Sequence, residues 1–223
     1  GKTAIDFLGY KNLVGAFYQP SAVIIDPEVL KTLPERQFNN GLCESIKMAA
    51  TSDSELFKML EENDAEDIID TVIEKSLLIK KQVVEEDEKE TGLRKVLNFG
   101  HTIGHAIEEA YAADGRTVKH GYCVLWGMVA ELYLSVIRLG FPVEILSQIS
   151  HVMLEYYGRP ECDCHQRNQL IEWMLRDKKN KVLSETGKCE ITFSLLRDVG
   201  VGVMDQIVTD KDIDEALEYL FSL

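Results

Sequence analysis

Residues 65–86 read AEDIIDTVIEKSLLIKKQVVEE. Apolar residues such as Ile69, Val72, Ile73 and Val83 recur there at spacings of three and four, which is the pattern of a helix with one apolar face. The same period predicts further helices, over residues 34–50, from 53 onward, and over 98–112, 121–139, 143–157 and 210–220. We expect the apolar faces of residues 68–84 and 124–139 to pack on each other. The sequence therefore predicts a mainly α-helical domain.

Few stretches have the character of strands. Residues 22–26 (AVIID) form a short apolar run that ends at Pro27, and residues 190–196 (EITFSLL) follow a turn at Gly187; both are typical of buried strands. Residues 6–15 (DFLGYKNLVG) are interrupted by glycine and predict a loop. The expected fold class is thus mainly α-helical with a few short strands near the start and the end. Asp210 or Asp212 is the expected cap of the last helix.

Composition limits the partners. The 223 residues include 24 basic and 38 acidic side chains, for a net charge of −14, which opposes binding to nucleic acid or to an anionic membrane. Five cysteines without paired short spacings do not resemble a disulfide framework. No apolar run approaches the roughly 20 residues of a membrane helix, and no signal peptide is expected. These features favour a cytoplasmic protein that binds neither nucleic acid nor membrane.

The densest group of polar residues is in residues 94–105, RKVLNFGHTIGH. On a helix, His101 and His105 lie one turn apart on the same face, and Asn98, three residues earlier, would join them. Gly100 and Gly104 would allow backbone or ligand to approach closely. The residue pair His101 and His105 has no glutamate directly after its first histidine, which excludes the H-E-x-x-H protease pattern.

Two further residues could complete a site with these histidines. His120 opens the apolar helix 121–139, and Glu44 stands in residues 39–47, NNGLCESIK. Two imidazoles and one carboxylate that leave a coordination position open would suit catalytic zinc. Spacing alone does not bring these residues together.

Two other patterns carry less weight. Gly1-Lys2-Thr3 resembles the end of a phosphate-binding P-loop, but the residues after it do not predict the required helix. Cys162-Asp163-Cys164-His165 offers possible metal ligands, yet it has no partner C-x-x-C, so we interpret it as a surface turn.

A set of ordered motifs resembles one enzyme family. They are GKTAID, GYKNLVGAFYQP, DPEVLKTLP, GLCESIK, IKKQVV, DEKETGLRKVLNFGHTIGHAIE, KHG and MLRDKKN, spread from residue 1 to residue 180. Together they resemble the C-terminal part of the 3-dehydroquinate synthases over nearly the whole chain. The resemblance implies a two-domain enzyme, α/β plus α, whose N-terminal nucleotide-binding domain is missing here. Residues 1–20 would be a remnant of the loop between domains that binds substrate and NAD, and residues 21–223 the helical domain that binds metal and substrate.

The resemblance also assigns residues to roles. Zinc or cobalt would be held by Glu44, His101 and His120. The implied catalytic residues are Lys47, Lys80, Arg94, Asn98 and His105; substrate would also meet Lys2, Asn12 and Lys178 or Lys179; NAD would meet Lys11, Thr32 and Asn40. Lys2, Asn12, Asn98 and His105 would hold the phosphate of the substrate. The sequence departs from the family at Tyr122, because the family usually has glutamate after the histidine-glycine pair, and this puts the hydrogen bonding around His120 in question.

The implied activity is that of a lyase dependent on NAD and metal. It would convert 3-deoxy-arabino-heptulosonate 7-phosphate into 3-dehydroquinate with loss of phosphate, in the shikimate pathway that leads to chorismate and the aromatic amino acids. The full-length enzyme would be a homodimer, and this chain alone would be inactive. The alternatives are another sugar-phosphate cyclase, an iron-type alcohol or glycerol dehydrogenase, or a module that only binds metal and phosphate. Asn98 and His105 favour dehydroquinate, because the matching positions differ in the valiolone-forming relatives.

Overall fold

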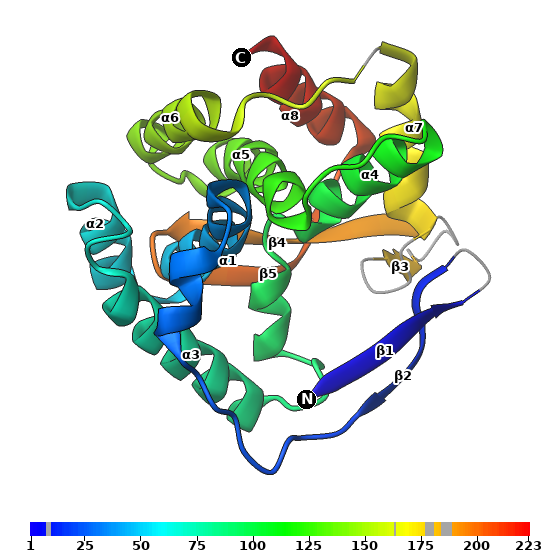
Figure 1. Ribbon diagram of the computed structural model, residues 1–223. Helices are drawn as coiled ribbons and strands as arrows, with labels where there is room; N and C mark the ends of the chain where they lie inside the picture. Colours follow the sequence, from blue (N-terminus) through cyan, green and yellow to red (C-terminus); the bar gives the residue numbers. More distant parts are fainter. Residues whose placement is uncertain (8–9, 163, 177–180, 184–188) are drawn as a thin grey trace. The chain divides into compact units, whose positions relative to one another are not determined.

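The computed structural model describes residues 1–7, 10–162, 164–176, 181–183 and 189–223 (Figure 1). The chain divides into two compact units, Gly1–Leu33 and Pro34–Leu223. The assignment of residues 1–20 to an interdomain loop and of residues 21–223 to a helical domain stays a prediction.

The first unit contains a β-hairpin. Strands β1 (Lys2–Phe7) and β2 (Tyr10–Phe17) pair antiparallel, with Lys2 opposite Phe17. The loop expected over residues 6–15 is therefore wrong, because both of its ends belong to paired strands. A 3-10 helix, η1 (Pro27–Thr32), follows, and the side chain of Asp26 caps it by accepting a hydrogen bond from the N–H of Glu28.

The strand expected at residues 22–26 is also wrong. These residues are extended, but no strand pairs with them among the described residues, and Ile24 is 93% exposed. The apolar run forms no buried strand because a unit of this size has no core in which to bury it.

The second unit confirms the mainly α-helical class. Its α-helices are α1 (Glu35–Ser52), α2 (Ser54–Glu62), α3 (Ile69–Glu86), α4 (His101–Ala113), α5 (His120–Leu139), α6 (Val143–Val152), α7 (Cys164–Arg176) and α8 (Asp210–Ser222). A π-helical turn (Met153–Tyr157) continues α6, and a 3-10 helix, η2 (Leu93–Asn98), precedes α4. All but α7 agree with helices expected from the apolar period, within a few residues at their ends.

A three-stranded antiparallel sheet completes this unit. Strands β3 (Lys181–Leu183), β4 (Cys189–Asp198) and β5 (Val201–Val208) lie in the order β3-β4-β5. The strand expected at residues 190–196 is confirmed as part of β4, and its two neighbours were missed. The cap of α8 is Thr209, whose hydroxyl accepts from the N–H of Asp212, so the expected cap at Asp210 or Asp212 is wrong.

Helix α5 is the centre of the core. It packs against α1, α4, α6, α8 and β4 (Figure 1). Helix α3 packs instead against α1 and η2, and its Val72 joins Ala49 and Leu56 in a separate small cluster. The expected packing of residues 68–84 on residues 124–139 is thus replaced by packing of each helix on α1.

The composition of α5 follows from this central position. Among the described residues it is the one helix long and apolar enough to cross a membrane, although the sequence analysis found no run of that kind. Of its most apolar window, 72% is buried inside the fold. The apolar residues of α5 serve the core.

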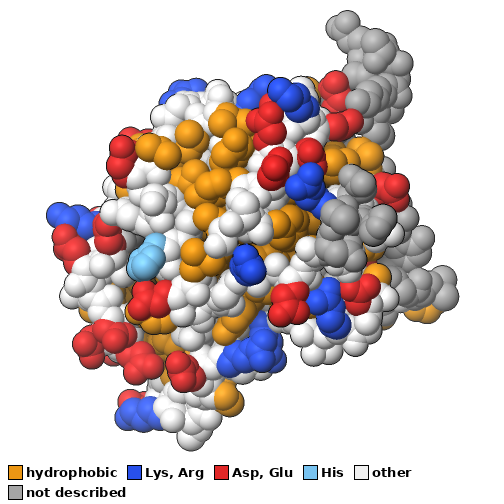
Figure 2. Space-filling view, turned by 90° about the horizontal axis from the view of Figure 1, so that it is seen from above, with side chains coloured by type: hydrophobic (Ala, Val, Ile, Leu, Met, Phe, Trp, Pro, Cys, Tyr) orange, Lys and Arg blue, Asp and Glu red, His pale blue; other side chains and the backbone are white. Residues whose placement is uncertain are grey.

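The charge of the chain is mixed on the face seen from above. Apolar side chains there lie among acidic and basic ones (Figure 2). The net charge of −14 therefore does not make this face uniformly negative.

Candidate metal and substrate site

Three histidines meet where α4 and α5 begin. His101 and His105 come from the first two turns of α4, and His120 is the first residue of α5. One ring nitrogen from each lies within 4.8 Å of the others. The ring centroids are 5.2 Å apart for His101 and His105, 5.4 Å for His101 and His120, and 5.7 Å for His105 and His120. We call these residues the imidazole cluster.

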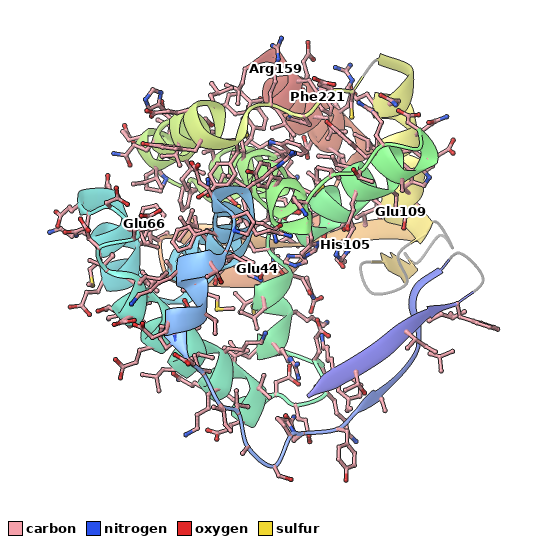
Figure 3. The ribbon with its side chains drawn as sticks, viewed as in Figure 1. Glu44, Glu66, His105, Glu109, Arg159 and Phe221 are labelled. Carbon is pink, nitrogen blue, oxygen red and sulfur yellow. The ribbon has the colours of Figure 1, made fainter. Side chains whose placement is uncertain are left out.

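A carboxylate from a third helix reaches the imidazole cluster. Glu44 lies on α1, and its Oε1 is 3.5 Å from Nε2 of both His101 and His120. Figure 3 labels Glu44 on α1 and His105 on α4. Its Oε2 accepts a hydrogen bond from Nζ of Lys47, which lies one turn further along α1 and is only 3% exposed. The fold thus brings together Glu44, Lys47 and the three histidines.

The donor atoms fit a zinc or cobalt ion. Both metals accept imidazole nitrogen and carboxylate oxygen, and a catalytic zinc has three protein ligands and one open position. Two sets of three ligands are present, and both contain His101 and His120. The third ligand is Glu44 in one set and His105 in the other.

The site carries unusual pKa values. Burial favours the neutral form of Glu44, but hydrogen bonds from His101 and His120 and the charge of Lys47 outweigh it and hold its pKa well below the usual range. Burial lowers the pKa of His101 to about 4, although Glu44 acts in the opposite direction. Hydrogen bonds to Glu108 and Glu44 raise the pKa of His120 to about 9. The cluster thus lowers the pKa of His101 and raises that of His120.

A close contact between α1 and α5 places Glu44 beside His120. A Cβ atom at Gly121 would lie 2.0 Å from the backbone oxygen of Asn40. The side-chain oxygen of Asn40 accepts a hydrogen bond of 2.8 Å from the N–H of Gly121. Asn40 thus joins α1 to the first turn of α5, and its contact with NAD stays a prediction.

The second partner of His120 is a residue to which the sequence analysis gave no role. Nδ1 of His120 lies 3.1 Å from Oε2 of Glu108, on α4. Glu108 follows His105 by three residues, so helical spacing places both on one face, and that spacing is the signal that could have found it. Tyr122 does not take this position, because its ring is buried against Tyr157 and Trp126.

The spacing suggested that Asn98 shares a helical face with His101, but the structure shows that it does not. It ends η2, and Gly100 between them has φ of 77°, so the helix restarts at His101. Glycine is required there because side chains disfavour this left-handed region. Nδ2 of Asn98 donates a hydrogen bond of 2.8 Å to Oε1 of Glu90, a second carboxylate that the sequence analysis missed.

Arg94 is the second residue of η2. It is 5% exposed, and its guanidinium donates to the backbone oxygen of Glu88. The carboxylate of Asp87 accepts from the backbone N–H groups of Thr91, Gly92 and Arg94. Asp87 therefore organises the turn that carries Glu90 and leads into η2.

The other predicted residues lie on other elements of the chain. Lys80 is exposed on α3. Lys2, Lys11 and Asn12 belong to the hairpin and Thr32 to η1, in the first unit. Lys178 and Lys179 lie outside the described residues. Cys162 forms no disulfide with another described residue, and Asp163 next to it is likewise outside the described residues.

Comparison with protein families gives two adjoining matches. Residues 41–180 match the family described as 3-dehydroquinate synthase C-terminal, and residues 1–40 match 3-dehydroquinate synthase N-terminal. The chain is 41% identical over 223 residues to the 3-dehydroquinate synthase of Parabacteroides distasonis, which covers 98% of this chain and 62% of the relative. It is 42% identical over 225 residues to that of Clostridium acetobutylicum, with 99% and 60% covered. The chain thus spans about 60% of the length of these curated relatives.

Solved structures give the same fold. The 2-epi-5-epi-valiolone synthase ValA of Streptomyces hygroscopicus, with NAD+ and Zn2+ bound, superimposes with a TM-score of 0.82 at 26% identity, over 99% of this chain and 61% of that one. A 2-deoxy-scyllo-inosose synthase in complex with carbaglucose-6-phosphate, NAD+ and Co2+ superimposes with a TM-score of 0.77 at 25% identity, over 98% and 62%.

Proposed function

The chain belongs to the 3-dehydroquinate synthase family, and from this premise we propose that it supplies the metal- and substrate-binding part of a 3-dehydroquinate synthase. The complete enzyme would convert 3-deoxy-arabino-heptulosonate 7-phosphate into 3-dehydroquinate and eliminate phosphate. The observation that carries this proposal is the position of Glu44, 3.5 Å from the Nε2 atoms of both His101 and His120. Three helices converge to make this arrangement, and zinc or cobalt accepts these donors.

The proposed cofactors are NAD and one zinc or cobalt ion. The two superimposed cyclases contain NAD+ with Zn2+ or with Co2+. When bound, the metal supplies Lewis acidity at a substrate hydroxyl and NAD supplies hydride transfer. We assign Glu44, His101 and His120 as the metal ligands. We assign Lys11, Thr32 and Asn40 to contacts with NAD.

The remaining assigned residues would bind and orient the sugar phosphate. Lys47 is buried with its charge beside Glu44, so it can meet a substrate oxygen next to the metal ligands. Arg94 presents a planar guanidinium suited to a carboxylate. Asn98 and His105 would hold the phosphate, together with Lys2, Asn12 and Lys178 or Lys179 from elsewhere in the chain. Lys80 would contact the carboxylate and hydroxyl end of the substrate.

Metal analysis of single variants of this chain tests the ligand assignment. We expect Glu44→Ala, His101→Ala and His120→Ala each to lose the stoichiometric zinc, and His105→Ala to retain it. Retention by Glu44→Ala combined with loss by His105→Ala would instead assign the three histidines as ligands. Full retention by all four variants would reject a metal site here.

The substrate assignment needs a complete two-domain protein. The chain can be fused to the part of the Parabacteroides distasonis relative that precedes the match. We expect the fusion to release phosphate from 3-deoxy-arabino-heptulosonate 7-phosphate when NAD and zinc are present. A fusion that binds zinc but releases no phosphate from this substrate would favour another sugar-phosphate cyclase. A valiolone-type cyclase is the second candidate, which the superposition on ValA supports.

We also propose a cytoplasmic location and a homodimer for the complete enzyme. Cys43, Cys123 and Cys162 form no disulfide in the described part of the chain, which agrees with a reducing compartment.

A further inference from the structure

A carboxylate that no assigned role uses lies entirely within the core. Glu131 is on α5 and is 0% exposed. Its Oε2 accepts a hydrogen bond of 2.6 Å from the N–H of Gly100, and its Oε1 accepts one of 3.2 Å from the N–H of Ile103. Within the described chain its side chain forms no ion pair. A buried carboxylate is costly to keep without a cation, so its partners on the backbone require an explanation.

These partners are the free N–H groups at the start of α4. The first turn of any helix has backbone N–H groups without acceptors in the helix, and a carboxylate there also opposes the positive end of the helix dipole. The residue before α4 is Gly100, which has no side chain with which to cap the helix. Glu131 therefore supplies from α5 the cap that the sequence of α4 lacks.

The two capping hydrogen bonds lie on either side of one histidine of the imidazole cluster. Gly100 precedes the first turn of α4, Ile103 lies within that turn, and His101 lies between them. A single carboxyl group therefore holds the backbone on both sides of His101. A second contact has the same effect, because a Cβ atom at Gly127 on α5 would lie 2.0 Å from the backbone oxygen of Gly100. The start of α4 is thus held against α5, the helix whose first residue is His120.

Glu131 acts at a distance from the site itself. It follows His120 by eleven residues on α5, which at about 1.5 Å per residue is roughly 16 Å along the helix. Its described hydrogen bonds go to backbone N–H groups of the start of α4 rather than to the ring of a histidine. Its influence on the metal ligands passes through the backbone of α4.

We propose that Glu131 is a positioning residue that holds the start of α4 so that His101 and His105 face His120 in a geometry ready to bind metal. This inference rests on the proposed metal site. The buried side chain of Glu131 would then determine how rigidly His101 and His105 are held.

The test compares two variants of the same helix. Glu131→Gln replaces one accepting oxygen by an NH2 group that faces an N–H donor. Ser135→Ala is the matched control: Ser135 is also buried on α5, one turn further on, and it bonds the backbone of Glu131 and Leu196 rather than α4. The measurements are the Kd for Co2+, the visible absorption of bound Co2+, which reports ligand geometry, and Tm.

We expect Glu131→Gln to weaken Co2+ binding by about 10- to 100-fold, as loss of groups that support metal ligands does, and to alter the Co2+ spectrum. Ser135→Ala should lower Tm but leave the affinity and the spectrum unchanged. Unchanged affinity in Glu131→Gln, or an equal loss in Ser135→Ala, would overturn the proposal. If Glu131→Gln does not fold, Glu131→Asp replaces it: the shorter side chain keeps the carboxyl group but cannot reach both N–H groups, so the affinity for Co2+ should also fall.

Failure of the metal site and failure of this inference can be separated. If the wild-type chain binds no Co2+, the proposed metal site fails. The ring signals of His101 and His105 in NMR spectra of the metal-free chain then test the inference. They should shift in Glu131→Gln and stay unchanged in Ser135→Ala, and unchanged signals in both variants would reject a positioning role for Glu131.

Discussion

Tyr122, at the position where the resemblance led us to expect glutamate, packs its ring in the core against Tyr157 and Trp126. His120 is nevertheless supported, because its Nδ1 faces Glu108 on the neighbouring helix α4. A carboxylate at this nitrogen fixes the tautomer that leaves Nε2 free for a metal, and it increases the basicity of the ring. Glu108 therefore provides the support that Tyr122 cannot.

Glu108→Ala should weaken zinc binding by about 10- to 100-fold, because His120 loses the partner that orients it. The matched control is Glu109→Ala, which removes the adjacent, exposed glutamate of the same helix (Figure 3). Competition titration with a chelating dye measures both Kd values. Equal affinity in the two variants would show that Glu108 does not support the metal site.

Asp87 predicts a pH dependence of stability. Hydrogen bonds from the backbone N–H of Thr91, and from those of Gly92 and Arg94, lower the pKa of Asp87 to about 2 from its usual 3.8. Because the folded pKa is the lower one, the ionised carboxylate stabilises the fold above pH 3.8, and this contribution is lost as pH falls through about 2. Asp87→Asn should therefore flatten the decline in unfolding free energy over this window.

Urea titrations of wild type and Asp87→Asn at pH 4.5, 3 and 2 provide the measurement. The two proteins should differ most at pH 4.5 and approach each other toward pH 2. Asp70→Asn is the control, since Asp70 is an exposed carboxylate on α3 and should change little at any of these values. Parallel curves for wild type and Asp87→Asn would contradict the assigned pKa.

The helices meet at glycines, and these contacts set the distances in the site. Helix α5 approaches α1 at Gly121, beside Asn40, and approaches α4 at Gly127, beside Gly100. Any side chain at these points must push a backbone segment aside. The separation between Glu44 on α1 and His120 on α5 therefore depends on a residue that has no functional group.

Gly121→Ala should destabilise the fold by about 1–3 kcal/mol, as overpacking does, because its Cβ would lie 2.0 Å from the oxygen of Asn40. It should also weaken zinc binding, since it moves His120 away from Glu44. Gly41→Ala is the control within α1: no atom lies within 4 Å of its Cβ position, and alanine favours helix by up to about 1 kcal/mol. Thermal unfolding and zinc titration would contradict this account if both variants behaved alike.

In the molecule as a whole, the imidazole cluster and most of the core lie within Pro34–Leu223, whereas several residues assigned to substrate and NAD lie in Gly1–Leu33. The chain spans about 60% of the length of its curated relatives, and its sequence has no G-x-G-x-x-G pattern after a strand. We therefore expect this chain to bind metal without turning over substrate.

We expect the 223-residue chain to fold and bind zinc but to release no phosphate from the heptulosonate phosphate, even with NAD. Orientation of reacting groups can account for about 7–11 kcal/mol of a barrier, and a cofactor held on one side only loses that contribution. The comparison is a phosphate-release assay of the chain beside the fusion described above. Equal rates would mean that the complete NAD site lies within these residues.

The helices and the family could be predicted from the sequence, because both depend on local order. The apolar period of α3, α4 and α5 needs only neighbours three and four residues away, and motifs such as residues 87–108 are continuous in the chain. His101, His105 and His120 were named from that information. So was Glu44, although no spacing connects it with them.

The pairings between distant segments required the tertiary structure. The hairpin of β1 and β2 was missed, and residues 22–26 were wrongly expected to be a strand, because a strand exists only where a partner satisfies its backbone. Asn98 was placed on the wrong face because the φ of Gly100 interrupts the helix. Glu90, Glu108 and Glu131 acquire meaning only through Asn98, His120 and the backbone of α4, and such contacts depend on how helices pack rather than on the order of residues along them.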